Sequence, residues 1–106
     1  MQIIVVGCGK VGHTLAERLS GEGHNLVLVD LDAKLIQEVT DELDVMGVVG
    51  NGASINVLME AGIDTADLLI AVTTSDELNL LCCLIGKKAS KRCMTIARVR
   101  DPMYNK

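Results

Sequence analysis

Short apolar runs alternate with longer amphipathic stretches from one end of the chain to the other. Each run is almost continuously apolar, which is typical of strands that a parallel sheet buries on both faces. We expect such strands at Gln2–Val6, Asn25–Asp30, Asp44–Val49, Asp67–Val72 and Met94–Val99.

The stretches between these runs have the periodicity of helices. Val11, Leu15 and Leu19 recur at intervals of four, and Gly21 and Gly23 follow where that helix should end. Three further helices are predicted: one that carries Leu35, Ile36, Val39 and Leu43, one that begins near Ser54 and stops at Gly62, and one from about Ser75 to Ala89.

Strict alternation of strand and helix, with right-handed crossovers, predicts one doubly wound, Rossmann-type α/β domain over residues 1–106. The expected parallel sheet has strand order 3-2-1-4-5, lies between two layers of helices, and ends after its fifth strand. Pro102 is expected to lie in the first turn of another helix.

A glycine-rich turn joins the first strand to the first helix. Residues Gly7-Cys8-Gly9-Lys10-Val11-Gly12 fit the pattern G-x-G-x-x-G, and Asp30 ends the next strand. Gly7 permits the tight turn, Gly9 lets a pyrophosphate approach the backbone, and Gly12 lets the helix lie close to the strand. The helix N-terminus attracts phosphate, and Asp30 can accept hydrogen bonds from ribose hydroxyls. This combination predicts a nucleotide site.

The carboxyl ends of the other strands should meet at the same edge of the sheet. They supply Leu31 beside Asp30, the turn Gly50-Asn51-Gly52, the hydroxyls of Thr73, Thr74 and Ser75, and Arg98. We expect Leu31, Asn51, Gly52, Thr73, Thr74 and Arg98 to contact the ligand. The alternatives are that the hydroxyls cap the following helix and that Arg98 is a solvated charge or a contact between subunits.

Composition narrows the class of protein. Hydrophobic residues make up 49% of the 106 residues, with Tyr104 the one aromatic, and the mean hydropathy is +0.36. A net charge of −4 without a basic patch argues against nucleic acid as a partner. No apolar run is long enough for a membrane span and no signal sequence precedes the first strand, so we expect a cytoplasmic protein. Buried thiols are expected at Cys8, Cys82, Cys83 and Cys93, with a disulfide or metal site as the alternative.

Catalytic groups are scarce. His13 and His24 have no carboxylate or nucleophile pattern beside them, and we expect both on the surface. A dehydrogenase fragment is the rival class, but hydride transfer needs a substrate pocket and usually an acid or base. We therefore predict that the chain is not an enzyme. The last helix is apolar over most of its circumference, and Leu80 and Leu84 suggest a subunit interface, unless other parts of a longer protein cover them.

Two further sequence motifs resemble those of a known family. Ala71-Val72-Thr73-Thr74-Ser75-Asp76-Glu77-Leu78-Asn79 and Ala97-Arg98-Val99-Arg100-Asp101-Pro102, followed by Tyr104, are similar to the Trk potassium-uptake regulators. The nucleotide domain of that family is also called the RCK or KTN domain. The glycine loop is shared with many dehydrogenases and is less specific.

The resemblance implies a cytoplasmic, NAD(H)-binding regulatory domain. It would form homo-oligomeric rings on a membrane-embedded potassium transporter or channel, and its ligand state would change the geometry of the subunits. The implied cofactor contacts are Gly7, Cys8, Gly9, Lys10, Val11, Asp30, Thr73, Thr74 and Arg98. The residues leave NAD+, NADH and ATP or ADP open as ligands. The family's sixth strand, crossover helix and carboxyl-terminal domain have no counterpart here, so we expect a truncated or stand-alone module and leave open an inert nucleotide-binding scaffold.

Overall fold

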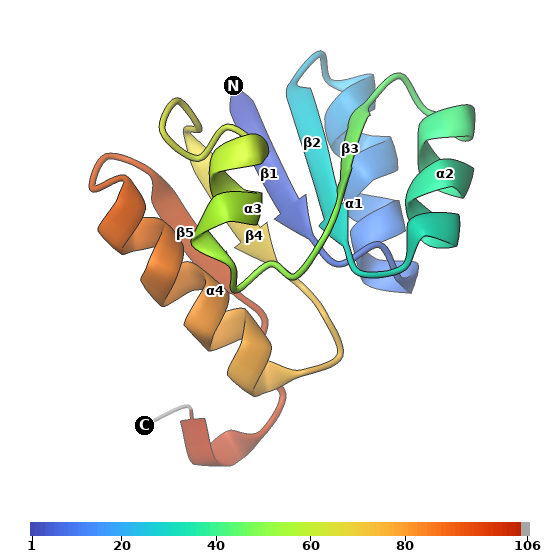
Figure 1. Ribbon diagram of the computed structural model, residues 1–106. Helices are drawn as coiled ribbons and strands as arrows, with labels where there is room; N and C mark the ends of the chain where they lie inside the picture. The colour runs from blue at the N-terminus through green and yellow to red at the C-terminus, as the bar shows by residue number, and fades with distance from the viewer. Residues whose placement is uncertain (105–106) are drawn as a thin grey trace.

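The computed structural model describes residues 1–104, which form a five-stranded parallel sheet with strand order β3-β2-β1-β4-β5 (Figure 1). The predicted order is confirmed. The strands are β1 (Gln2–Val6), β2 (Asn25–Asp30), β3 (Met46–Val49), β4 (Leu68–Ala71) and β5 (Met94–Ala97). The helices are α1 (Lys10–Gly21), α2 (Ala33–Glu42), α3 (Ile55–Glu60) and α4 (Asp76–Ala89), and a short 3-10 turn spans Pro102–Tyr104.

Helices cover both faces of the sheet, as expected for a doubly wound fold. Figure 1 shows α1 and α2 together on one side and α3 and α4 on the other. Alternate residues of β1 point to the two layers: Ile3 and Val5 join the core beneath α1 and α2, whereas Ile4 and Val6 join the core beneath α3 and α4. This double burial explains why the central strands are continuous apolar runs.

Side-chain caps set the starts of three helices. The carboxylate of Asp32 accepts from the backbone N–H groups of Lys34 and Leu35 at the start of α2. Ser54 and Ser75 cap α3 and α4 through their hydroxyl oxygens. The predicted starts near Ser54 and Ser75 are thus confirmed, since these side chains satisfy N–H groups that a helix leaves unpaired.

β3, β4 and β5 are shorter than their apolar sequences predict, and the two edge strands, β3 and β5, are also more exposed. β3 covers Met46–Val49 instead of residues 44–49, β4 lacks one predicted residue at each end, and β5 stops at Ala97 instead of Val99. Met94 and Ile96 of β5 are exposed, because α1 and α2 lie over β1, β2 and β3 and no helix among residues 1–104 covers this face of β5. The expectation of strands buried on both faces is therefore wrong for the two edge strands.

None of the helices described within residues 1–104 has the length and apolar character required of a membrane span.

Candidate functional site

A cavity of about 310 Å³ opens at the carboxyl ends of β1, β2 and β4, where the strand order reverses. Ligands of doubly wound sheets bind at this switch point. The cavity is lined by Val6, Gly7, Gly9, Val29, Asp30, Leu31, Leu35, Gly50, Gly52, Val72, Thr73, Thr74, Ser75 and Leu78. Seven of these belong to the predicted site: Gly7, Gly9, Asp30, Leu31, Gly52, Thr73 and Thr74.

The three glycines of the loop have different structural roles. Gly7 has a φ of +110°, and a Cβ there would lie 2.9 Å from the backbone nitrogen of Thr73. A Cβ on Gly12 would overlap the carbonyl oxygen of Gly7, so this glycine allows α1 to lie against the loop. A Cβ on Gly9 would meet no protein atom within 4 Å. Since Gly9 lines the cavity, the space beside it is open to a ligand.

The N-terminus of α1 lacks the cap that the other helices have. Gly9 occupies the N-cap position and supplies no side-chain hydrogen bond, and the first turn of α1 contains no acidic residue. The backbone N–H groups of that turn have no intrahelical acceptor, because the first four donors of any helix are unpaired. With the helix dipole they form a site suited to a phosphate group at the edge of the cavity.

Asp30 is held in place by two backbone N–H groups, one in the glycine loop and one at the start of α2. Its Oδ2 accepts from the N–H of Cys8 at 2.8 Å, and its Oδ1 accepts from the N–H of Asp32 at 2.8 Å. Each carboxylate oxygen can accept a second hydrogen bond, because an ionised carboxylate offers about four acceptor sites. Asp30 is thus fixed in one orientation with acceptor capacity left for a pair of hydroxyls.

A buried amide organises the opposite wall. Asn79 is fully buried in α4, and its Oδ1 accepts from the N–H of Thr73 at 2.9 Å and the hydroxyl of Thr73 lies 2.7 Å away. Its Nδ2 donates to the carbonyl oxygens of Thr73 and Arg98 at 3.1 and 2.9 Å. Asn79 therefore ties the loop after β4 to the end of β5. The Thr73 hydroxyl also accepts from the N–H of Ser75, so it has little capacity left for a ligand.

The segment after β5 folds back onto the start of α4. The carboxylate of Asp76 accepts from the N–H groups of Arg100 and Asp101 at 3.1 and 2.8 Å, and these bonds lower the pKa of Asp76. The guanidinium of Arg100 donates to the carbonyl oxygen of Thr74 at 2.6 Å. Tyr104 donates to Glu77 at 2.6 Å, which lowers the pKa of Glu77 and raises that of Tyr104. The loop that lines the cavity is thus joined directly to the carboxyl-terminal segment.

Six predicted contacts do not line the cavity: Cys8, Lys10, Val11, Gly12, Asn51 and Arg98. Cys8 is packed in the core beneath α1 and α2, Gly12 lies behind the loop, and the side chain of Asn51 accepts from the N–H of Ala53. The backbone of Arg98 extends the pairing of β5 with β4, and it is Arg100 that reaches the loop after β4. For Lys10 and Val11, ligand contact through the backbone of the first helical turn stays a prediction.

Other residues at the site were missed. Leu35, Gly50, Ser75 and Leu78 line the cavity, and Asn79 and Arg100 hold its wall. Gly50 and Ser75 were predicted at the carboxyl ends of the strands, but neither was among the expected ligand contacts. A signal for Asn79 was present, since it is an amide in an otherwise apolar helix and such a residue needs partners when buried.

The cysteines are the buried thiols that the sequence predicts. All four are free; Cys8, Cys82 and Cys93 are buried, and Cys83 is half-buried. Burial raises the pKa of Cys8 and of Cys82 to about 12. These thiols are protonated at neutral pH and are poor nucleophiles.

Comparison with known proteins identifies the family of this chain. The profile of the TrkA-N domain matches residues 3–106. The chain belongs to the TrkA-N domain family. The Trk system potassium uptake protein TrkA of Azorhizobium caulinodans is 43% identical over 104 residues, which are 98% of this chain and 23% of that protein. This TrkA-N domain therefore spans about a quarter of the length of that relative. The family is not one of enzymes, in agreement with the sequence prediction.

Solved structures share the fold of this TrkA-N domain. The Kef CTD of Shewanella denitrificans in its AMP-bound form has a TM-score of 0.85 at 22% identity, with 97% of this chain and 62% of that chain covered. The GsuK channel bound to NAD has a TM-score of 0.84 at 22% identity, with 97% and 18% covered. The Rossmann-type architecture predicted from the sequence is thereby confirmed.

Proposed function

We propose that this TrkA-N domain is a nucleotide-sensing regulatory domain of a potassium uptake system or channel, and that NAD(H) binds at the glycine loop. The observation that carries the proposal is the cavity at the switch point, where Asp30 lies beside the uncapped N-terminus of α1 and accepts from the N–H of Cys8. One offers acceptors to a ribose and the other offers donors to a pyrophosphate.

The cavity fits the adenosine half of the ligand. The exposed side chain of Leu31 and the neighbouring Leu35 offer an apolar surface to a base next to Asp30. The pyrophosphate then lies over Gly9, where the protein leaves space. The nicotinamide half extends toward Thr74, in the loop that Arg100 and Asn79 connect to the carboxyl-terminal segment.

Adenine mononucleotides are the second candidate ligands. The AMP-bound Kef structure shares the fold, and an adenosine group needs the same Asp30 and glycine loop. ATP, ADP and AMP would leave the loop after β4 without a nicotinamide contact. The two ligand classes are thus expected to bind at one place and to differ in what they do to that loop.

Regulation requires a partner surface. Leu80, Leu81 and Leu84 are exposed on α4, the helix that begins directly after the cavity loop. We propose that this surface meets a second copy of the chain, and that the assembly acts on a membrane-embedded potassium transporter or channel from its cytoplasmic side. A displacement of the loop after β4 would move α4 and thereby change the interface.

Small-angle scattering of the chain with NADH, ATP, AMP or no nucleotide tests the switch. We expect an oligomer whose dimensions with NADH differ from those with ATP or AMP, because a ligand shifts an equilibrium only when it binds the two states unequally. Leu84→Glu should reduce the oligomer to monomers, while Arg18→Glu, at an exposed position of α1 on the opposite face of the sheet, should leave it intact. A monomer under every condition would contradict the regulatory proposal and leave a binding module.

A further inference from the structure

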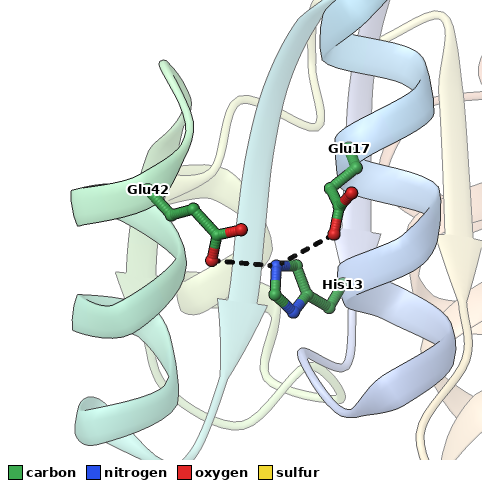
Figure 2. A group of neighbouring side chains, drawn as sticks. All are labelled: His13, Glu17 and Glu42. Atoms are coloured by element: carbon green, nitrogen blue, oxygen red, sulfur yellow. Dashed lines mark ion pairs between the residues drawn. The ribbon is translucent and has the colours of Figure 1, made fainter.

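Three side chains converge between α1 and α2, away from the nucleotide cavity. His13 and Glu17 are one turn apart on α1, and Glu42 is the last residue of α2. One donor atom from each lies within 4.8 Å of the other two. Figure 2 shows the imidazole of His13 in the gap between the helices, with Glu17 beside it on α1 and Glu42 reaching across from α2.

The Nε2 atom of His13 faces two carboxylates. It lies 3.4 Å from Oε1 of Glu17 and 3.3 Å from Oε2 of Glu42, yet this atom is buried and forms no hydrogen bond with any of residues 1–104. Nε2 therefore lies within ion-pair distance of two carboxylates without a hydrogen bond to either. The lone pair of a neutral imidazole with Nδ1 protonated would instead face the same space as the two carboxylates.

The distances match the coordination sphere of a small metal ion. Ligand atoms about 2.0–2.1 Å from a tetrahedral Zn²⁺ are separated from each other by roughly 3.3–3.4 Å, from tetrahedral geometry. The two distances from Nε2 have these values, and the donor oxygens of the two glutamates lie within 4.8 Å of each other. An ion at the centre would bring the donor atoms into contact with it without a change of fold.

The chemistry of the donors selects the kind of ion. A neutral imidazole and two carboxylates carry a charge of −2, which a divalent cation balances. Imidazole favours Zn²⁺ and other late divalent transition metals, whereas Mg²⁺ and Ca²⁺ prefer oxygen ligands alone. The glutamates are more than half exposed, so an ion can enter from solvent.

We propose that His13, Glu17 and Glu42 form a binding site for a divalent transition metal, with Zn²⁺ as the reference ion and a fourth position left to water. Three protein ligands plus a water is a common arrangement for zinc. The ion joins α1 to α2, so it stabilises the folded chain and not the unfolded one. The site is independent of the nucleotide proposal, since none of its residues lines the cavity.

Calorimetric titration of the metal-free, reduced 106-residue chain with ZnCl₂ tests this site. We expect one Zn²⁺ to bind and Mg²⁺ to give no heat. Glu42→Gln should weaken zinc binding at least about tenfold, since even the loss of a group that only supports a ligand costs 10–100-fold. Glu38→Gln is the matched control, because Glu38 is exposed on the same helix one turn earlier and is not one of the three clustered residues.

Two further measurements separate this site from other causes. Circular dichroism should show that both glutamine variants keep the wild-type fold, because the side chains they replace are exposed. Cys83 is the half-buried thiol and the main competing ligand, so Cys83→Ser should retain zinc binding. Absence of zinc binding, equal affinity in Glu42→Gln and wild type, or loss of binding in Cys83→Ser would overturn the proposal; the first result would leave only an ion pair at His13.

Discussion

Replacing Gly9 by alanine should weaken nucleotide binding and leave the stability of the fold almost unchanged. Gly9 lies at the N-cap of α1 with a φ of −70°, which alanine adopts without strain, and the added Cβ meets no protein atom within 4 Å. Loss of a favoured N-cap residue costs about 0.5–1 kcal/mol, but a smaller unfolded-state entropy returns about 0.4–1 kcal/mol. We therefore expect the free energy of unfolding to change by less than about 0.5 kcal/mol.

The same methyl group should disturb a bound nucleotide. If the pyrophosphate lies against the backbone of Gly9, the Cβ occupies space that the phosphate oxygens need. Overpacking of this kind costs about 1–3 kcal/mol, which raises the Kd for NADH roughly 5- to 150-fold. Calorimetric titration with NADH measures this change, and urea unfolding of the same samples measures the stability.

Two other glycines of α1 provide the controls. Gly21 also has open space around its Cβ position but lies at the far end of the helix, so Gly21→Ala should bind NADH like wild type. Gly12→Ala should destabilise the fold, because its Cβ overlaps the carbonyl of Gly7. An unchanged Kd for NADH in Gly9→Ala would refute the placement of the pyrophosphate.

Two further predictions concern the wall of the cavity. Asn79→Ala should lower the free energy of unfolding by about 2 kcal/mol in urea titration, because it leaves partly buried backbone groups of Thr73 and Arg98 without their partner at about 1 kcal/mol each; a loss under about 0.5 kcal/mol would contradict the network. Asp76 has a lowered pKa in the fold, so its stabilising effect is present above the ordinary value of 3.8 and is lost as the pH falls through the lower value. Asp76→Asn should remove that part of the acid dependence of stability, and an identical pH profile for variant and wild type would contradict this.

Local sequence patterns predict most of the helices and strands. The apolar run of β1 and the four-residue spacing of Val11, Leu15 and Leu19 predict their elements because each reflects burial of a single segment. The edge strands were predicted too long and too buried, since an apolar run does not reveal whether a helix covers it. That depends on which neighbours the strand has in the sheet.

The site could be predicted only in part. The glycine loop and Asp30 are close in sequence to elements with a recognisable pattern, and the structure places them at one cavity. Asn79 instead bonds to Arg98, 19 residues away, and Arg100 reaches Thr74, 26 residues away. Such contacts arise from tertiary packing, so no local periodicity indicates them.

The cluster at His13 shows the same limit. The spacing of His13 and Glu17 puts both on one face of α1, which the sequence could have indicated. Its third member, Glu42, lies 29 positions from His13 and approaches only because α1 and α2 lie side by side (Figure 1). His13 was expected to be a surface histidine, and the structure places it half-buried between two carboxylates.

Side-by-side calorimetric titration with NADH and NADPH tests most directly the claim that Asp30 reads the ribose of a bound dinucleotide. A 2′-phosphate would stand within a few ångströms of this fixed carboxylate, where two unit charges about 4 Å apart repel by up to about 4 kcal/mol at an effective dielectric of 20. We expect NADH to bind at least about tenfold more tightly than NADPH, and Asp30→Ala to weaken NADH binding and reduce the difference. Equal affinities for NADH and NADPH in the wild-type chain, or no binding of either, would contradict the account.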